Sequence, residues 1–188
     1  EPEAFAKVLI LRGMAQFDAG RAVEAIATLE GAVEASAKST LRIQFDAAFA
    51  LFVRATYFQS PEETIPGLTR LRQLAARAGD AYALGGLHLA VARIEGLRGH
   101  CIDAHRHVEI ARHLSAQQTS DALGCSVDLV ESSLELVAGN LARSRLVVGD
   151  CLRRAELASL SRFKVGALSN FGLVSLFSGN VMLARRSF

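Results

Sequence analysis

Apolar residues recur along almost the whole chain at spacings of three and four positions. The stretch "GCSVDLVESSLELVAG" ends at Gly139, and "ARSRLVVGDCLRRAELA" begins at Ala142. This spacing is typical of amphipathic helices packed on one side, and the alternation expected of β-strands is missing. We therefore predict about ten helices and no β-sheet. The expected ranges are 3–19, 22–38, 40–58, 61–78, 81–98, 101–115, 119–138, 141–159, 162–178 and 181–188.

A short glycine-centred motif returns between these helices. "LVAGNLARSR" stands at 136–145 and "FSGNVMLARR" at 177–186, and the motif glycines are Gly20, Gly99, Gly139 and Gly179. The last three are forty residues apart (139 − 99 and 179 − 139), and the first gap is 79, nearly two periods. We interpret each motif as a turn between two helices, with Asn140 and Asn180 capping the second helix.

The missing turn falls near residue 60, where the chain reads "FQSPEET". Ser60 is expected to be an N-cap, with Pro61 at the first helical position and Glu63 completing a capping box. A period of 20–50 residues made of paired helices is typical of a solenoid. The sequence therefore predicts about five helix pairs of about 40 residues each.

Small residues recur at fixed numbers of positions before and after each turn glycine. Two helices approach to about 8–10 Å only where the facing side chains are small, so these positions are expected to lie where the helices cross. A larger apolar residue, expected to fill the space against the next helix, follows nine positions after each glycine. The small positions are Gly13, Ala92, Ser132 and Gly172 (seven before), Ala25, Ala104, Ser144 and Ala184 (five after), and Ala32, Ala111 and Cys151 (twelve after). The larger residues are Leu29, Val108, Val148 and Phe188.

This pattern resembles the tetratricopeptide (TPR) repeat, whose helix–turn–helix unit carries small residues at its eighth and twentieth positions. The resemblance covers essentially all of residues 1–188 and implies one all-α domain, a right-handed superhelical solenoid of antiparallel pairs. The period is forty rather than the usual thirty-four. The family's early aromatic positions hold Leu9, His88, Asp128 and Leu168 instead.

The resemblance also implies a concave binding surface lined by the first helix of each pair. The implied surface is apolar with one charge, and it lacks the Lys and Asn with which related proteins clamp a chaperone's carboxylate tail. An amphipathic segment or a neighbouring domain would suit it. The groove positions are Ile10, Met14, Phe17, Phe49, Phe52, Thr56, Leu89, Arg93, Gly96, Leu129, Ser133, Leu136, Ser169, Leu173 and Leu176.

Composition and charge narrow the class of partner. The 188 residues are 51% hydrophobic and 6% aromatic, and the formal net charge is +2 with the basic residues scattered. Such a balance predicts neither nucleic-acid nor membrane binding, and the apolar run 165–177 is too short to span a bilayer. Cys101, Cys125 and Cys151 form no CxxC pair, which favours a reducing, cytoplasmic setting.

No constellation in the chain favours catalysis. Cys101, His105 and Glu109 share a helical face and could contact zinc, but no fourth ligand is evident, so we expect a polar outer face beside a buried Cys101. Cys151 occupies a small packing position, which explains it without reactivity. No nucleophile elbow or phosphate loop is present. We expect a protein that is not an enzyme and holds neither metal nor cofactor.

The Ala/Leu/Arg-rich array resembles the repeat regions of large bacterial LuxR-type, ATP-dependent transcription activators. That resemblance implies a protein-interaction or sensory scaffold that receives a peptide, protein or effector and controls a separate DNA-binding domain. The alternative is a general adaptor that assembles protein complexes. The last predicted helix, 181–188, is much shorter than its siblings. We therefore expect a piece of a longer protein whose exposed end associates with another copy or frays.

Overall fold

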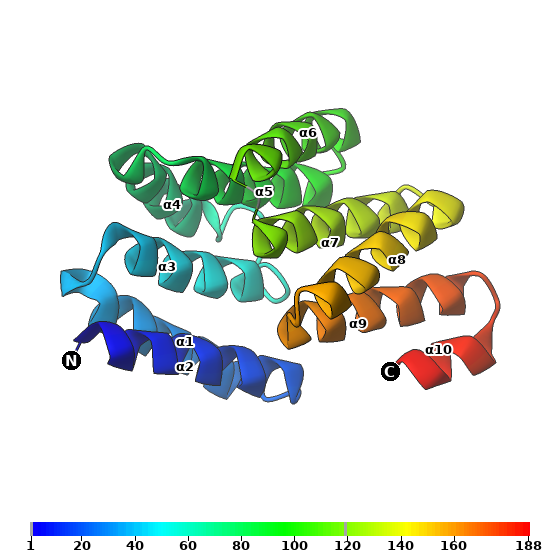
Figure 1. Cartoon of the computed structure of the whole chain (residues 1–188), viewed down its shortest axis with the longest axis horizontal. Helices are drawn as coiled ribbons and strands as arrows, with labels where there is room; N and C mark the ends of the chain where they lie inside the picture. Colours follow the sequence, from blue (N-terminus) through cyan, green and yellow to red (C-terminus); the bar gives the residue numbers. More distant parts are fainter. Residues whose placement is uncertain (1, 119) are drawn as a thin grey trace. The chain divides into compact units, whose positions relative to one another are not determined.

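The computed structural model describes residues 2–118 and 120–188, and this part of the chain is all-helical, with ten α-helices, one short 3-10 helix and no strand (Figure 1). The number and order of the predicted helices are confirmed. The helices are α1 (Pro2–Asp18), α2 (Ala22–Ala35), α3 (Leu41–Ala55), α4 (Ile65–Ala78), α5 (Ala81–Leu97), α6 (Cys101–Gln118), α7 (Asp121–Val137), α8 (Leu141–Leu157), α9 (Ser161–Phe177) and α10 (Val181–Ser187), and the 3-10 helix η1 is Ser36–Lys38.

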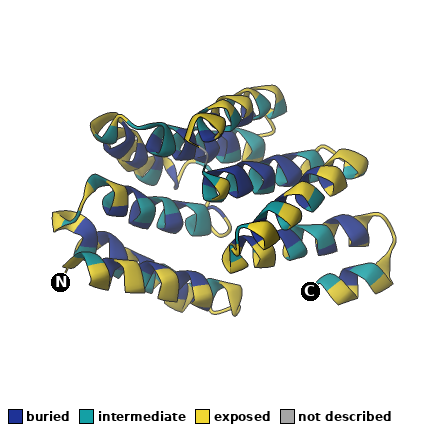
Figure 2. Ribbon diagram, viewed as in Figure 1, coloured by how far each residue is buried: buried dark blue, intermediate teal, exposed yellow. Residues whose placement is uncertain are grey.

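Two compact units divide the described chain within α5, the first ending at Ala90 and the second beginning at Val91. The two helices of a pair pack together in α1–α2 and α3–α4 of the first unit and in α7–α8 and α9–α10 of the second. Most helices carry buried residues on one side and exposed residues on the other, as the spacing predicts (Figure 2). The predicted start of the seventh helix, at residue 119, lies outside the described residues, and α7 begins at Asp121.

The four motif glycines end their helices in the same way, which confirms the predicted turns. The N–H of Gly139 donates to the carbonyl of Leu136 at 3.1 Å, and the N–H of Asn140 donates to that of Glu135 at 2.8 Å. These two bonds define a Schellman turn, which needs a left-handed residue after the helix. Glycine adopts that conformation without a Cβ clash. The same bonds and φ values of 76–80° occur at Gly20, Gly99, Gly139 and Gly179.

Of the two predicted asparagine caps, Asn180 is confirmed and Asn140 is wrong. The side-chain oxygen of Asn180 accepts a hydrogen bond from the N–H of Leu183 at 3.0 Å, as an N-cap should. Asn140 makes no such bond. Its side-chain amide instead donates to Oε2 of Glu135 at 2.9 Å, because a strong carboxylate acceptor lies directly across the turn.

The predicted helix start at Pro61 is also wrong. The capping box forms, since the N–H of Ser60 donates to Glu63 at 2.7 Å and the N–H of Glu63 donates to Ser60 Oγ at 3.3 Å. It closes a turn, however, and α4 begins only at Ile65. Pro66 explains the difference, because proline has no N–H to donate and its ring clashes with the preceding turn inside a helix. The helix must therefore begin close to Pro66.

The predicted small residues are buried at every position, and tight helix crossings are seen at Gly13 and at Ser144. A Cβ placed on Gly13 would come within 2.6 Å of Leu29 Cγ and 3.3 Å of the Ala25 carbonyl oxygen. At the equivalent crossing of α7 and α8, the hydroxyl of Ser144 donates to the carbonyl of Ser132 at 2.7 Å. The register of small residues to the turn therefore marks where the two helices of a pair approach most closely.

The larger residue nine positions after the glycine also packs toward the next helix, as predicted: Leu29 shares an apolar cluster with Ile43 of α3, and Val148 shares one with Phe163 of α9. Leu29 lies against Gly13, and in the same register the ring of Phe188 lies 2.8 Å from a Cβ built on Gly172. Leu29 is fully buried, but Phe188 is 70% exposed. One face of the Phe188 ring covers Gly172 and the remainder is open, so its packing against a further helix stays a prediction.

We predict that Ala25→Leu and Ala104→Leu each lower the free energy of unfolding by about 1–3 kcal/mol. Both alanines are fully buried, so three extra carbons at these predicted crossing positions would force the helices apart. Ala27→Leu, at an exposed position of α2, is the matched control and should change stability by less than about 0.5 kcal/mol. Urea denaturation measures all three. Midpoints for the buried variants that match the control would contradict the assigned crossings.

Candidate functional site

The predicted groove positions of the first unit belong largely to its core. Ile10, Met14, Phe52 and Leu89 are at most 8% exposed, so these side chains are not open to a ligand on a concave surface. Ile10 and Met14 pack in one apolar cluster with Ile43, Ala47 and Ala50, because α1 and α3 contact each other through these faces.

Aromatic contacts occupy the two remaining phenylalanines of this set. The half-buried ring of Phe17 lies 5.3 Å from that of Tyr57 and 6.0 Å from that of Phe58, measured between centroids. The ring of Phe49 stacks on that of Phe45 at 5.9 Å. The groove implied by the resemblance therefore does not exist as an open surface in the first unit.

The second unit does bring predicted groove residues together, on the adjacent helices α7 and α9. Asn170 of α9 ties the two helices, since its amide donates to Ser132 Oγ at 2.8 Å and to Ser133 Oγ at 3.2 Å. The α7 members are half-buried, whereas Leu173 and Leu176 are 37% and 46% exposed. We define the α7–α9 face as the six predicted residues on these helices: Leu129, Ser133, Leu136, Ser169, Leu173 and Leu176.

Two residues beside this face were missed by sequence reasoning. Phe177, directly after Leu176, is 67% exposed and extends the apolar surface at the end of α9. Asn170 is the hydrogen-bonding tie, and no spacing rule identifies it because its partners lie 37 and 38 positions away. Arg93, the predicted lone charge, is half-buried on the part of α5 that belongs to the second unit.

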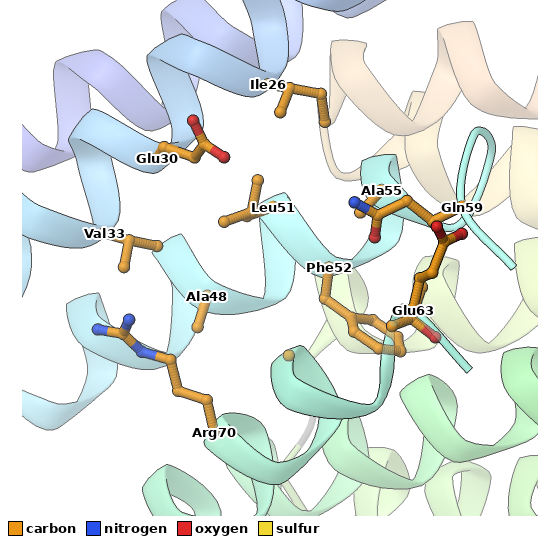
Figure 3. A pocket seen from close by; sticks show the side chains of 12 residues that line it. Ile26, Glu30, Val33, Ala48, Leu51, Phe52, Ala55, Gln59, Glu63 and Arg70 are labelled. Carbon is orange, nitrogen blue, oxygen red and sulfur yellow. The ribbon is translucent and has the colours of Figure 1, made fainter. Parts of the chain in front are cut away.

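A pocket of about 160 Å³ lies in the first unit, between α2, α3 and α4 (Figure 3). Ala48, Leu51 and Phe52 of α3 form its apolar floor, and Ile26 and Val33 of α2 form one wall. Its remaining lining residues are Glu30, Ala55, Gln59, Glu63, Thr64, Gly67 and Arg70. Phe52, a predicted groove residue, thus borders this pocket, although it is nearly fully buried.

Buried carboxylates of α7 hold the second unit together through arginines from both neighbouring helices. Arg112 of α6 pairs with Glu131 and, at 3.1 Å, with Asp128. From α8, Arg143 lies 2.8 Å from Glu131 and Arg154 lies 3.4 Å from Asp128. The two carboxylates are at most 5% exposed, whereas the arginines reach solvent. Three cations therefore compensate charges that would be costly to bury alone.

These pairs shift the protonation equilibria of the network. Burial raises the pKa of Asp128 above its usual value, although Arg112 and Arg154 oppose that shift. Burial works to lower the pKa of Arg112, but Glu131 and Asp128 outweigh it and the pKa rises. Arg112 and Arg154 also line a polar pocket of about 360 Å³ beside Ser115 and Ser120. With Asp121, Asp128 and Glu131 balancing the three arginines, we interpret this cluster as structural.

Gly124 makes room for one of these arginines. A Cβ at this position would lie 3.0 Å from Nη1 and 3.2 Å from Cζ of Arg154. The guanidinium of Arg154 therefore lies close to the backbone of α7, where it reaches Asp128. Sequence reasoning assigned Asp128 to an aromatic position of the repeat and missed this network, because its partners come from different helices.

The cysteines and histidines considered for chemistry are occupied by structural contacts. The ring nitrogens of His105 face the Cys101 carbonyl at 2.7 Å and Glu135 Oε1 at 3.1 Å, and Cys101 is only half-buried. No group of three or more metal-ligating side chains is found in residues 2–118 and 120–188. Cys125 and Cys151 are fully buried, and contact with the Cys125 thiol together with burial raises the pKa of Cys151. A protonated, inaccessible thiol is a poor nucleophile.

Comparison with known proteins gives no family assignment: no protein-family model matches the chain, and no curated protein matches it. Within the described part of the chain, none of the helices is both long enough and apolar enough to cross a membrane. The geometry of the α7–α9 face and of the two pockets therefore carries the functional argument.

We predict that Arg112→Gln lowers the free energy of unfolding at pH 7 by about 1–3 kcal/mol, because Asp128 and Glu131 lose a shared partner while buried. Burial raises the pKa of Asp128 and Arg112 opposes that shift, so the pKa should rise further in the variant, whose folded state then takes up a proton more readily than that of the unaltered chain as the pH falls. The loss should therefore shrink toward pH 4.5.

Arg106→Gln is the control for this variant. The Arg106 side chain is 70% exposed and pairs only across one helix turn with Asp103, so its removal should change stability by less than about 0.5 kcal/mol. Urea denaturation at both pH values gives the comparison. Equal losses for the two variants, or a loss for Arg112→Gln that grows as the pH falls, would refute the assigned network.

Proposed function

We propose that this chain is a non-catalytic binding module of TPR-like helix pairs, stacked as a right-handed solenoid, and that its α7–α9 face takes an apolar helical segment of a partner protein. The observation that carries the proposal is the exposure of Leu173 and Leu176, at 37% and 46%, beside the half-buried leucines of α7. Exposed apolar surface of this kind marks interaction sites in many proteins.

The chemistry of the face selects the partner. Its six residues are four leucines and two serines, without a charged side chain. Leu173 and Leu176 are three positions apart on α9, and Leu129 and Leu136 are seven apart on α7. Two such neighbouring leucine ridges suit a helix whose apolar residues follow the i, i+3, i+4, i+7 pattern. Burying each exposed leucine on binding would contribute up to about 1.5–3 kcal/mol.

We further propose that the module works in the cytoplasm as the interaction or sensory region of a larger bacterial regulator of transcription. The support for this step is the likeness of its forty-residue, Ala/Leu/Arg-rich repeat to the arrays of LuxR-type activators. In that role, occupancy of the α7–α9 face would report the presence of the partner to a separate output domain.

A peptide-display selection tests the face, using a library of helical peptides with leucine or phenylalanine at i, i+3, i+4 and i+7. We predict that selected peptides bind the unaltered chain and lose at least about tenfold in affinity to Leu173→Asp/Leu176→Asp, since two buried contacts become buried charges. Fluorescence anisotropy measures the dissociation constants.

The matched control is Leu146→Asp/Leu157→Asp, which alters two exposed leucines of α8 that lie outside the face. Its affinity for the selected peptides should stay within about threefold of the unaltered chain. Selection of no peptide, or equal loss of affinity in both double variants, would overturn the proposal. Circular dichroism of each variant checks that the helices remain folded.

A further inference from the structure

The pocket of the first unit combines an apolar floor with charged residues at its rim. Its volume of about 160 Å³ is close to that of an engineered apolar cavity of about 150 Å³ that binds benzene. The floor of Ala48, Leu51 and Phe52 is apolar, as such a ring requires. Gly67 keeps the cavity open on the α4 side, since a Cβ there would come within 3.2 Å of the Phe52 ring.

The rim carries more negative than positive charge. Figure 3 shows Gln59 and Glu63 next to each other at one end of the pocket, whereas Glu30 and Arg70 lie toward the opposite end, on either side of Val33. The carboxylate of Glu63 accepts the N–H of Ser60 at 2.7 Å, and this bond lowers the pKa of Glu63, so that it is ionised at neutral pH. Glu30 and Glu63 against Arg70 leave a net charge of −1.

The geometry points to a binding site for a small amphipathic cation, in which a benzene-sized apolar group enters between α2, α3 and α4 and an ammonium group faces Glu63, while Glu30 adds negative charge elsewhere on the rim. The Glu63 carboxylate offers a charge-assisted hydrogen bond to the ammonium, and the side-chain oxygen of the neighbouring Gln59 offers a further acceptor. This site lies in the first unit and does not depend on the α7–α9 face, which belongs to the second.

Three probes that share a phenyl ring and differ in charge test this inference: 2-phenylethylammonium, 2-phenylethanol and 3-phenylpropanoate. Titration of the full chain by methyl and amide NMR reports both affinity and location. We expect the cation to bind with a dissociation constant of about 0.1–5 mM, in keeping with its nine heavy atoms. It should bind at least about threefold more tightly than the alcohol and tenfold more tightly than the anion, with shifts centred on Ala48, Leu51 and Phe52.

Glu30→Gln/Glu63→Gln tests the charges, because glutamine at position 63 still completes a capping box with Ser60 and so preserves the turn. This variant should remove the preference for the cation over the alcohol while leaving the alcohol's affinity unchanged. Glu34→Gln, at an exposed position of α2 outside the lining, is the control and should keep the preference.

Ala48→Leu tests the cavity by filling its floor, and it should abolish binding of all three probes. Because Ala48 is only 6% exposed, circular dichroism must show that this variant stays folded, and the shift map of the unaltered chain gives the location independently. The inference is overturned if no probe binds at 10 mM (about twice the weakest expected dissociation constant), if the anion binds as tightly as the cation, or if the shifts fall outside the pocket.

Discussion

In each helix pair with a glycine turn, the packing of the two helices depends on the space available where they cross. The residue seven positions before the turn glycine and the residue nine positions after it share that space, as Gly13 and Leu29 do. Gly172 and Phe188 repeat the arrangement. The same two positions hold Ala92 with Val108 and Ser132 with Val148, all buried, so a larger residue on the first helix accompanies a smaller one on the second. This compensation conserves volume, which packed interiors require.

Much of the fold was predictable from sequence because the helix crossing lies a fixed number of residues from each turn glycine. Schellman turns leave a glycine signal, and close crossings leave a small-residue signal, because both exclude a side chain at one position. The glycine signal fails where another type of residue adopts the left-handed conformation at the end of a helix. Ser159 ends α8 with the same pair of hydrogen bonds and a φ of 55°, although it is not glycine. The capping box at Ser60 predicts a helix start at Pro61, but Pro66 delays the start of α4 to Ile65.

The candidate surfaces were less predictable, because they depend on which helix faces remain uncovered. A repeat pattern assigns Met14 and Leu173 to equivalent positions, each six before a turn glycine, yet Met14 is 4% exposed and Leu173 37%. Contact between α1 and α3 covers the first, and no local signal in the sequence carries that information. The carboxylates of α7 behave similarly, since Asp128 and Glu131 are recognisable as a structural pair only once arginines from α6 and α8 are placed around them.

The claim that the two crossing positions share one space is tested most directly by a double-mutant cycle on Gly13→Ala and Leu29→Ala. Alone, the first places a methyl 2.6 Å from Leu29 Cγ, and the second leaves a cavity that costs about 2–5 kcal/mol. Together the new methyl enters the vacated space, so the double variant should be more stable than the sum of the single effects by about 1–3 kcal/mol. The control cycle pairs Gly13→Ala with Leu71→Ala, a fully buried leucine of α4. The two single effects in the control cycle should add within about 0.5 kcal/mol. The same additivity in the Gly13–Leu29 cycle would contradict the shared space.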